Sequence, residues 1–364
     1  MVHFKGNELE LNPCLPLLPT PILKELTINH IDIVELLEAI PRICQHIERL
    51  KINISDTFLK VLPPSSLQSL VCALPCLTHL QFPSALLVIT PAMIQHLGDL
   101  PGLQECGTVQ ITGATFPSEL NKLFAPTSER FSNLRRLMFH SPTCGLAENM
   151  IKSLHRSLEH LGMYIENAQD PLALASLIAS LRGHTSLVSF KFLGPPTVEE
   201  EGEGAKIFTP LFELKELEEI SINNGYVSQL DDEDLAAAAA AWPCLRDLNL
   251  TPHVANPTLT LAGLVPLVKH CPLLTRLTLP VQCTPFDATL LDLDLCESSR
   301  VAFLILSCST TTEVEADDAS WCLAQLFPNL KAFMCPKNQD DPSATSWNIM
   351  ADRVNVYLGR CVSR

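Results

Sequence analysis

The sequence predicts an α/β solenoid built from a repeated unit of one short strand and one helix. Three observations lead to this prediction: leucine makes up 62 of the 364 residues, a short apolar motif recurs through nearly the whole chain, and helical segments that stop near a proline lie between its copies. A hydrophobic fraction of 47% with a charged fraction of only 18% is typical of a folded chain, because disordered chains combine low hydrophobicity with high charge.

The motif is an apolar residue followed, three and five positions later, by two more. Its twelve copies begin about 28 residues apart. The last two positions alternate as in a strand with one buried face, and so short a strand is stable only when it is stacked in a parallel sheet. The copies begin at Leu23, Ile47, Leu77, Leu103, Leu134, Leu158, Leu187, Leu217, Leu245, Leu274, Val301 and Leu330.

A repeat of this length and spacing is the signature of leucine-rich repeats. We therefore predict a leucine-rich-repeat solenoid, with a curved parallel β-sheet on the concave face and helices on the convex face. The repeats span residues 23–337 and include an acidic loop at 197–205. A proline-rich lead precedes them at 1–22, and a polar loop and capping helix follow at 338–364.

Helices are predicted between the copies at 36–43, 93–100, 174–181, 235–242, 264–270 and 321–327, with a last helix at 347–358. Pro101, Pro243 and Pro272 follow three of them closely, and proline forces the residue before it out of the helical region. Aspartate favours helix N-termini through side-chain caps and the helix dipole. The aspartate pairs at 231–232 and 317–318 therefore predict two helix starts.

Several steps from helix to strand read Leu-Pro-Cys-Leu at 74–77, Trp-Pro-Cys-Leu at 242–245 and Cys-Pro-Leu-Leu at 271–274. In this feature the chain resembles the irregular repeats of fungal-type F-box proteins. The resemblance implies the substrate-recognition part of an F-box-type ubiquitin-ligase subunit. It implies a Skp-type adaptor and a cullin as partners only if an F-box module lies upstream, because no such module is visible in this sequence.

Composition argues against several classes of function. A formal charge of −15 disfavours sequence-independent binding to nucleic acid or to anionic membranes, which both need a basic surface. No apolar run reaches the 18 residues of a membrane span, and no secretory signal opens the chain. We expect an intracellular protein, in cytoplasm or nucleus, with its 14 cysteines reduced. The cysteines in Pro-Cys-Leu are expected to fill the core.

No motif of a phosphate-binding loop, a zinc protease or a serine hydrolase occurs. We therefore expect no enzymatic activity, no cofactor and no metal. The acidic run at 231–234 is interpreted as a helix start, with a divalent cation as the alternative. The run at 199–203 is interpreted as a solvated loop, with docking of a basic partner as the alternative.

The outward positions of the strands predict a locally basic stretch on the concave face, despite the acidic composition. We hypothesise that this stretch, centred on Arg136, His140, His160 and Tyr164, recognises an acidic segment of a protein partner. The alternative is the ordinary charge mixture of a solvent-exposed sheet. The candidate residues are Arg49, Lys51, His79, Arg136, His140, His160, Tyr164 and Lys191.

Together these observations predict a non-enzymatic protein–protein interaction scaffold. The alternative function is a leucine-rich-repeat regulator of a partner enzyme, either an inhibitor or an activator of a small GTPase. Consensus short repeats carry an Asn or Cys three positions after the third apolar residue. The residues found there, such as Ile31, Ser55 and Ala85, disfavour the GTPase-activating and ribonuclease-inhibitor types.

Overall fold

The computed structural model describes residues 23–28, 40, 44–53, 64–82, 87–111, 130–154, 158–194, 204–251, 257–282, 296–308, 313–334 and 344–359. The chain divides into two compact units, Met1–Glu166 and Asn167–Arg364. The predicted lead at 1–22, nearly all of the acidic loop and the polar stretch at 338–343 lie outside the described residues.

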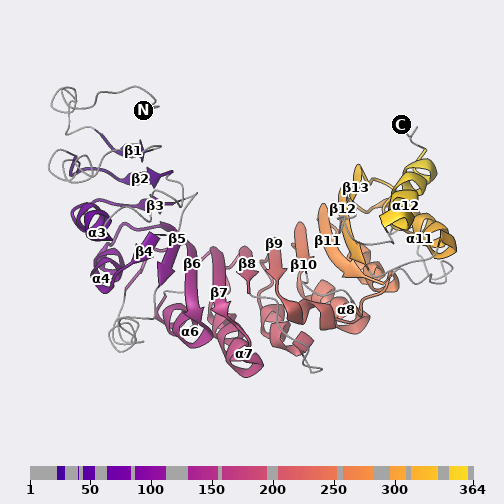
Figure 1. Ribbon diagram of the computed structural model, residues 1–364, viewed down its shortest axis with the longest axis horizontal. Coiled ribbons are helices and arrows are strands. Elements are labelled where there is room, and N and C mark those ends of the chain that lie inside the picture. Colours follow the sequence, from indigo (N-terminus) through magenta and orange to yellow (C-terminus); the bar gives the residue numbers. More distant parts are fainter. Residues whose placement is uncertain are drawn as a thin grey trace. The chain divides into compact units, whose positions relative to one another are not determined.

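The first unit is a sheet with helices along one face (Figure 1). Its strands follow the order β1-β2-β3-β5-β6-β7, and β4 adds to β5. Every pair with a described register is parallel. The elements are β1 (Glu25–Ile28), β2 (Arg49–Ile52), α3 (Pro64–Cys72), β3 (His79–Gln81), β4 (Leu87–Ile89), α4 (Pro91–Asp99), β5 (Glu105–Ile111), β6 (Arg136–Thr143), α6 (Cys144–Ser153) and β7 (His160–Asn167).

The second unit repeats this design with strands in the order β8-β9-β10-β11-β12-β13. These strands are also parallel. The elements are α7 (Pro171–Ala179), η3 (Ser180–Gly183), β8 (Ser189–Leu193), η4 (Gly204–Glu213), β9 (Glu219–Asn223), η5 (Gly225–Gln229), α8 (Asp232–Ala241), β10 (Asp247–Thr251), η6 (Ala262–Leu264), α9 (Val265–His270), β11 (Arg276–Val281), β12 (Phe303–Cys308), α11 (Glu313–Leu326), β13 (Ala332–Met334) and α12 (Ala344–Tyr357).

The core of each unit lies between its sheet and its helices. All twelve motif copies contain a strand, and equivalent positions of successive copies lie in register: Leu248 pairs with Ile220 on one side and with Leu277 on the other. These side chains are buried, so each copy covers the apolar face of its neighbours. The predicted α/β leucine-rich-repeat fold is confirmed.

In the motif copy that begins at Leu103, the prediction for the third apolar position is wrong. Thr108 was expected to point inward as the third apolar position of its copy. Instead, the register between β5 and β6 shifts between Cys106 and Val109, and Thr108 has a positive φ of 49°. This bulge inserts one residue, so Val109 occupies the buried position, and the Thr108 hydroxyl contacts the Met138 sulfur across the strands at 3.4 Å.

Most strands are longer than the short strand of about three residues that the motif predicts, although β3 and β13 have only 3 residues each. The strands β6 and β7 each have 8 residues, and β5 has 7. The short strand β4 has no motif of its own and pairs with the far half of β5 through Leu87 and Val109. The sheet of the first unit is therefore wider than six short motif strands alone would make it.

Of the predicted helices, the one at 36–43 lies outside the described residues except for residue 40. Among the described helices, the boundaries follow the predicted proline and aspartate signals with one exception. The helices α4, α8 and α9 each end two residues before Pro101, Pro243 and Pro272 respectively. The α8 N-terminus lies where expected, because Asp231 caps it in a capping box with Asp234. The second aspartate pair is not a helix start. Helix α11 begins at Glu313, and Asp317 binds Arg353 of α12 at 2.8 Å.

Replacing Asp231 with alanine is expected to lower the free energy of unfolding by about 1 kcal/mol. The Asp231 carboxylate accepts a hydrogen bond from the Asp234 amide at 2.9 Å, and this amide has no partner within the helix. The midpoint of urea unfolding, followed by circular dichroism, measures the loss. The matched control is Glu233→Ala in the same turn, where the side chain is exposed; equal losses in both variants would contradict the capping role.

Candidate functional site

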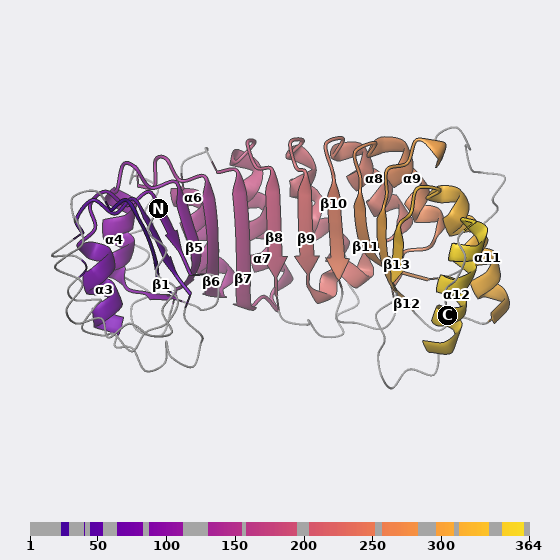
Figure 2. The ribbon, with the colours of Figure 1, turned by 90° about the horizontal axis from the view of Figure 1, so that it is seen from above.

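In each unit one face of the sheet carries no helix, and we call it the open face. Figure 2 shows the strands in front of the helices that cover the other side. The outward residues of neighbouring strands form rows across this face. In the first unit the first row pairs Glu25 with Arg49, Arg49 with His79, His79 with Glu105 and Glu105 with Arg136.

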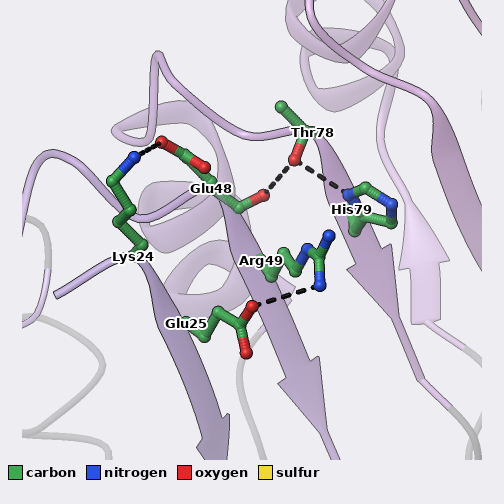
Figure 3. Close-up of polar contacts among 6 residues, drawn as sticks. All are labelled: Lys24, Glu25, Glu48, Arg49, Thr78 and His79. Atoms are coloured by element: carbon green, nitrogen blue, oxygen red, sulfur yellow. Dashed lines mark hydrogen bonds and ion pairs between the residues drawn. The ribbon is translucent and has the colours of Figure 1, made fainter. Parts of the chain in front are cut away.

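Two ion pairs reduce the basic character of this row at its start (Figure 3). The Arg49 guanidinium lies 3.1 Å from Glu25, and the Lys24 ammonium lies 2.7 Å from Glu48. Arg49 is one of the residues predicted for the partner-binding stretch, and Glu25 offsets its charge within the sheet. Both pairs are solvent-exposed, so each adds little to stability.

His79 is held by its neighbours and is mainly neutral at pH 7. Its Nδ1 lies 2.8 Å from the Thr78 hydroxyl, which also donates to the Glu48 carbonyl (Figure 3). Burial, together with the positive charges of Arg49 and Arg136, lowers the pKa of His79 below its usual 6.5. Its neighbour Glu105 accepts a hydrogen bond from Gln81 at 2.6 Å.

Arg136 is the exposed cation of this face. Within the described part of the chain no carboxylate lies at ion-pair distance from its guanidinium, and the same holds for Lys51. By contrast, the adjacent Arg135 is paired with Glu159 at 2.9 Å. Arg136, Met138 and His140 alternate along β6 with the buried Leu137 and Phe139, so the three share the open face.

The rings of His140 and Tyr164 stack across β6 and β7. Their centroids lie 4.3 Å apart with a tilt of 39°. Burial lowers the pKa of His140, and the nearby Glu166 partly opposes this shift. Glu166 itself accepts a hydrogen bond from Gln110 at 3.2 Å. The structure therefore brings together His140 and Tyr164, as the sequence predicts, but as a largely neutral aromatic pair.

Met138 is a residue of this surface that the sequence analysis did not single out. Its side chain is 42% exposed and lies over Gly162, where an added Cβ would approach the Met138 side chain to 3.1 Å. Methionine adapts readily to different partner shapes. His160, the remaining predicted residue of this unit, begins β7 and is half-buried.

Lys191 belongs to the second unit, where its ammonium lies 3.9 Å from Glu219. Together they line a hollow of about 280 Å³ on the open face. Sequence reasoning missed this hollow, although the outward positions of the eleventh and twelfth motif copies, Phe303, Ile305 and Met334, are visibly apolar. The hollow is lined by Lys191, Glu219, Ile220, Ser221, Asp247, Asn249, Arg276, Leu277, Thr278, Phe303 and Ile305.

Groups that bind metal do not gather in the described residues: no three His, Cys, Asp or Glu side chains are placed to hold an ion. The acidic run at 231–234 is a helix start, as interpreted, and Asp232 accepts two hydrogen bonds from Thr260 at 2.8 and 2.6 Å. None of the helices that the structure describes is long and apolar enough to cross a membrane.

The cysteines divide into two groups, which corrects one expectation. Cys76 and Cys244 of the Pro-Cys-Leu steps are exposed and half-buried respectively. They were expected in the core, but they lie in the turn before a strand, where the side chain points outward. Cys106 and Cys271 are buried, and burial raises the pKa of each thiol to about 12.

No protein-family profile matches the chain, and no curated protein matches it. Similar solved structures include the Rad7 and Elc1 complex in yeast, with 13% identity, a TM-score of 0.44, and coverage of 85% of this chain and 86% of that chain.

A leucine-rich repeat-containing protein, LegL7 from Legionella pneumophila, shows 11% identity, a TM-score of 0.36 and coverage of 91% and 89%. These similarities are too weak to carry an argument about function. From its own repeat and strand register, the chain is an α/β leucine-rich-repeat protein.

Proposed function

We propose that this protein is a non-enzymatic scaffold that binds another protein on the open face of its first unit. The observation that carries the proposal is the cluster on β6 and β7. There Arg136, which meets no carboxylate among the described residues, lies on the same face as the exposed Met138 and the stacked His140 and Tyr164. Arginine, tyrosine and methionine are enriched at protein interfaces.

The partner we propose carries an acidic segment. Arg136 has a free fork of donors that suits a carboxylate, while the aromatic pair offers a flat surface beside it. The binding stretch is narrower than the sequence predicts, because Arg49 is paired with Glu25 and the His79 and His140 rings are mainly neutral at pH 7. Arg136 and Lys51 supply its positive charge.

Within this role, we propose that the chain acts as the substrate-recognition part of an F-box-type ubiquitin-ligase subunit. The support is the Pro-Cys-Leu steps between helix and strand, at 75–77 and 243–245. The second candidate is a repeat protein that regulates a partner enzyme. Affinity purification of the full chain from its source cells separates the two: a Skp-type adaptor with a cullin supports the first, and a single stoichiometric enzyme supports the second.

Replacing Arg136 with glutamate is expected to reduce capture of this partner at least tenfold at low salt, because the variant repels the acidic segment. The loss is expected to shrink at about 0.5 M salt, where charges are screened within a few ångströms. Quantitative mass spectrometry of the captured proteins measures both values.

The matched control is Arg182→Glu, which makes the same charge change on the helical side of the second unit, where Arg182 pairs with Glu213 at 3.0 Å. Capture by this variant is expected to stay within about twofold of the unmodified chain. If both variants lose capture equally, the loss reflects the net charge of the protein and not the Arg136 surface. If the Arg136 variant captures the partner as well as the unmodified chain, the proposed binding surface is contradicted.

A further inference from the structure

The hollow on the open face of the second unit has two chemically different halves. One half holds four charged side chains. Glu219 on β9, Asp247 on β10 and Arg276 on β11 lie in register, and Lys191 on β8 lies two residues beyond Ser189, the register partner of Glu219. The other half is apolar and is lined by Phe303 and Ile305 of β12, beside which Met334 of β13 lies in register with Ile305. Apart from Lys191, the residues of this surface differ from the candidate residues of the acidic-segment site, and none of them belongs to the cluster on β6 and β7, so the two proposals can be tested separately.

The charged half places two carboxylates side by side between two cations. Glu219 and Asp247 are direct partners in the register of β9 and β10, and like charges in such positions are unfavourable. Asp247 is satisfied by Arg276 at 2.6 Å. Glu219 accepts a hydrogen bond only from Ser189, at 3.2 Å among the described groups, while Lys191 stays beyond hydrogen-bond distance at 3.9 Å.

Glu219 therefore keeps acceptor capacity. A carboxylate offers about four acceptor sites, and the Glu219 side chain is 44% exposed. A cation that enters the hollow can donate hydrogen bonds to Glu219, and its charge reduces the repulsion between Glu219 and Asp247. An incoming carboxylate would be repelled by Glu219 and Asp247, because the cations Lys191 and Arg276 already face these two carboxylates.

The apolar half consists of the exposed Phe303 and the half-buried Ile305, and the exposed Met334 extends it onto β13. Phe303 is 47% exposed, Met334 is 54% exposed, and Ile305 pairs with Met334 across β12 and β13. Phe303 lies directly beside Arg276 in the register of β11 and β12. The strip consists of three side chains and borders Arg276 on the β11 side, so it fits one bulky side chain better than the broad apolar surface of an obligate dimer.

We propose that this hollow binds an extended protein segment that carries one bulky apolar residue and, nearby, one lysine or arginine. The apolar residue packs on Phe303, Ile305 and Met334, and the basic residue reaches Glu219 and Asp247. Adjacent strands lie about 4.8 Å apart, so β12 is about 10 to 14 Å from β10 and β9. An extended segment rises about 3.3 Å per residue, which places the two residues three or four positions apart.

The test selects a phage-displayed library of random linear peptides on the immobilised full chain. Enriched peptides are expected to combine a Phe, Leu, Ile, Met or Trp with a Lys or Arg three or four positions away. A synthetic peptide of the enriched sequence is then titrated in solution by fluorescence anisotropy. Its affinity is expected to fall at least tenfold for Phe303→Ser and for Met334→Ser, and severalfold at low salt for Glu219→Gln.

Two matched controls remove residues of the same type from the helical side of the second unit. Leu172→Ser replaces a leucine of α7 that is 81% exposed, and Glu213→Gln replaces an exposed carboxylate that pairs with Arg182. Both are expected to bind the peptide within about twofold of the unmodified chain. Thermal unfolding confirms that each variant is folded, and Met334→Ser, at the edge of the sheet, keeps the test valid should Phe303→Ser unfold.

Several outcomes would overturn the proposal. These are enriched peptides that carry acidic instead of basic residues, peptides without a bulky apolar residue, and affinities unchanged in both apolar variants. Self-association of the chain that is lost in Phe303→Ser would assign the surface to a second copy instead. Because Arg136 belongs to the other unit, Arg136→Glu is expected to leave peptide binding unchanged even if the acidic-segment site proves wrong.

Discussion

Replacing Trp242 with alanine is expected to lower the free energy of unfolding by about 3–5 kcal/mol, the range for truncating a large buried aromatic residue. The indole is 3% exposed, and its Nε1 donates to the Leu211 carbonyl at 3.0 Å. The ring also meets Phe212 edge-on at 5.4 Å. Truncation leaves a cavity and an unpaired carbonyl between η4 and the end of α8. The midpoint of urea unfolding, followed by circular dichroism, measures the loss.

The matched control is Trp321→Ala, because the Trp321 side chain on α11 is 42% exposed. This variant is expected to lose less than about 1 kcal/mol. Trp242→Phe is expected to fall between the two, since it keeps most of the apolar volume but cannot donate to Leu211. A Trp242→Ala variant as stable as the Trp321→Ala variant would contradict the packing described for this repeat.

The buried thiols are expected to resist alkylation in the folded protein by about three orders of magnitude. Burial raises the pKa of Cys271 from the ordinary 9.0 to about 12. At Cys106 burial is again the main cause of a pKa of about 12, and the charge of Glu105 adds to it. The thiolate is the reactive form, so three pKa units remove all but about a thousandth of it near pH 8.

Pulse alkylation with iodoacetamide, followed by peptide mass spectrometry, measures this protection. Cys76 is exposed and provides the internal control, which is expected to react within the pulse. Unfolding in guanidinium is expected to bring Cys106 and Cys271 to similar rates. Rapid labelling of the two buried thiols in the folded chain would contradict their placement between sheet and helices.

Much of the fold was predictable because it depends on local spacing. The motif positions alternate at the period of a strand, and each copy repeats the pattern, so Leu248 and Leu277 were identified as core residues from sequence alone. The prediction failed where a backbone irregularity intervened. The bulge at Thr108 shifts one residue out of the core. Its signals in that copy are Gly107 within the strand and a polar residue at the third apolar position.

The sequence predicted which residues lie on the open face, but not which of their charges are offset by ion pairs. The repeat places His140 and Tyr164 on neighbouring strands, and their rings do stack. The sequence places Arg49 and Glu25 on the same face, but the hydrogen bond between them joins residues 24 positions apart and depends on the register of the two strands. Phe303, Ile305 and Met334 had a readable signal, since their copies carry apolar residues on both faces of the strand.

By itself, the sequence determined the class of fold, the twelve strands and the absence of a basic overall surface. Only the tertiary structure decided which charges remain free, because ion pairs such as Arg276 with Asp247 join residues 29 positions apart and depend on the register between strands. The hollow of the second unit likewise exists only where the five strands β8 to β12 lie side by side. The alternation of residues along a strand determines which face a side chain occupies. Which other side chains it contacts depends on how separate repeats pack and in which register their strands pair.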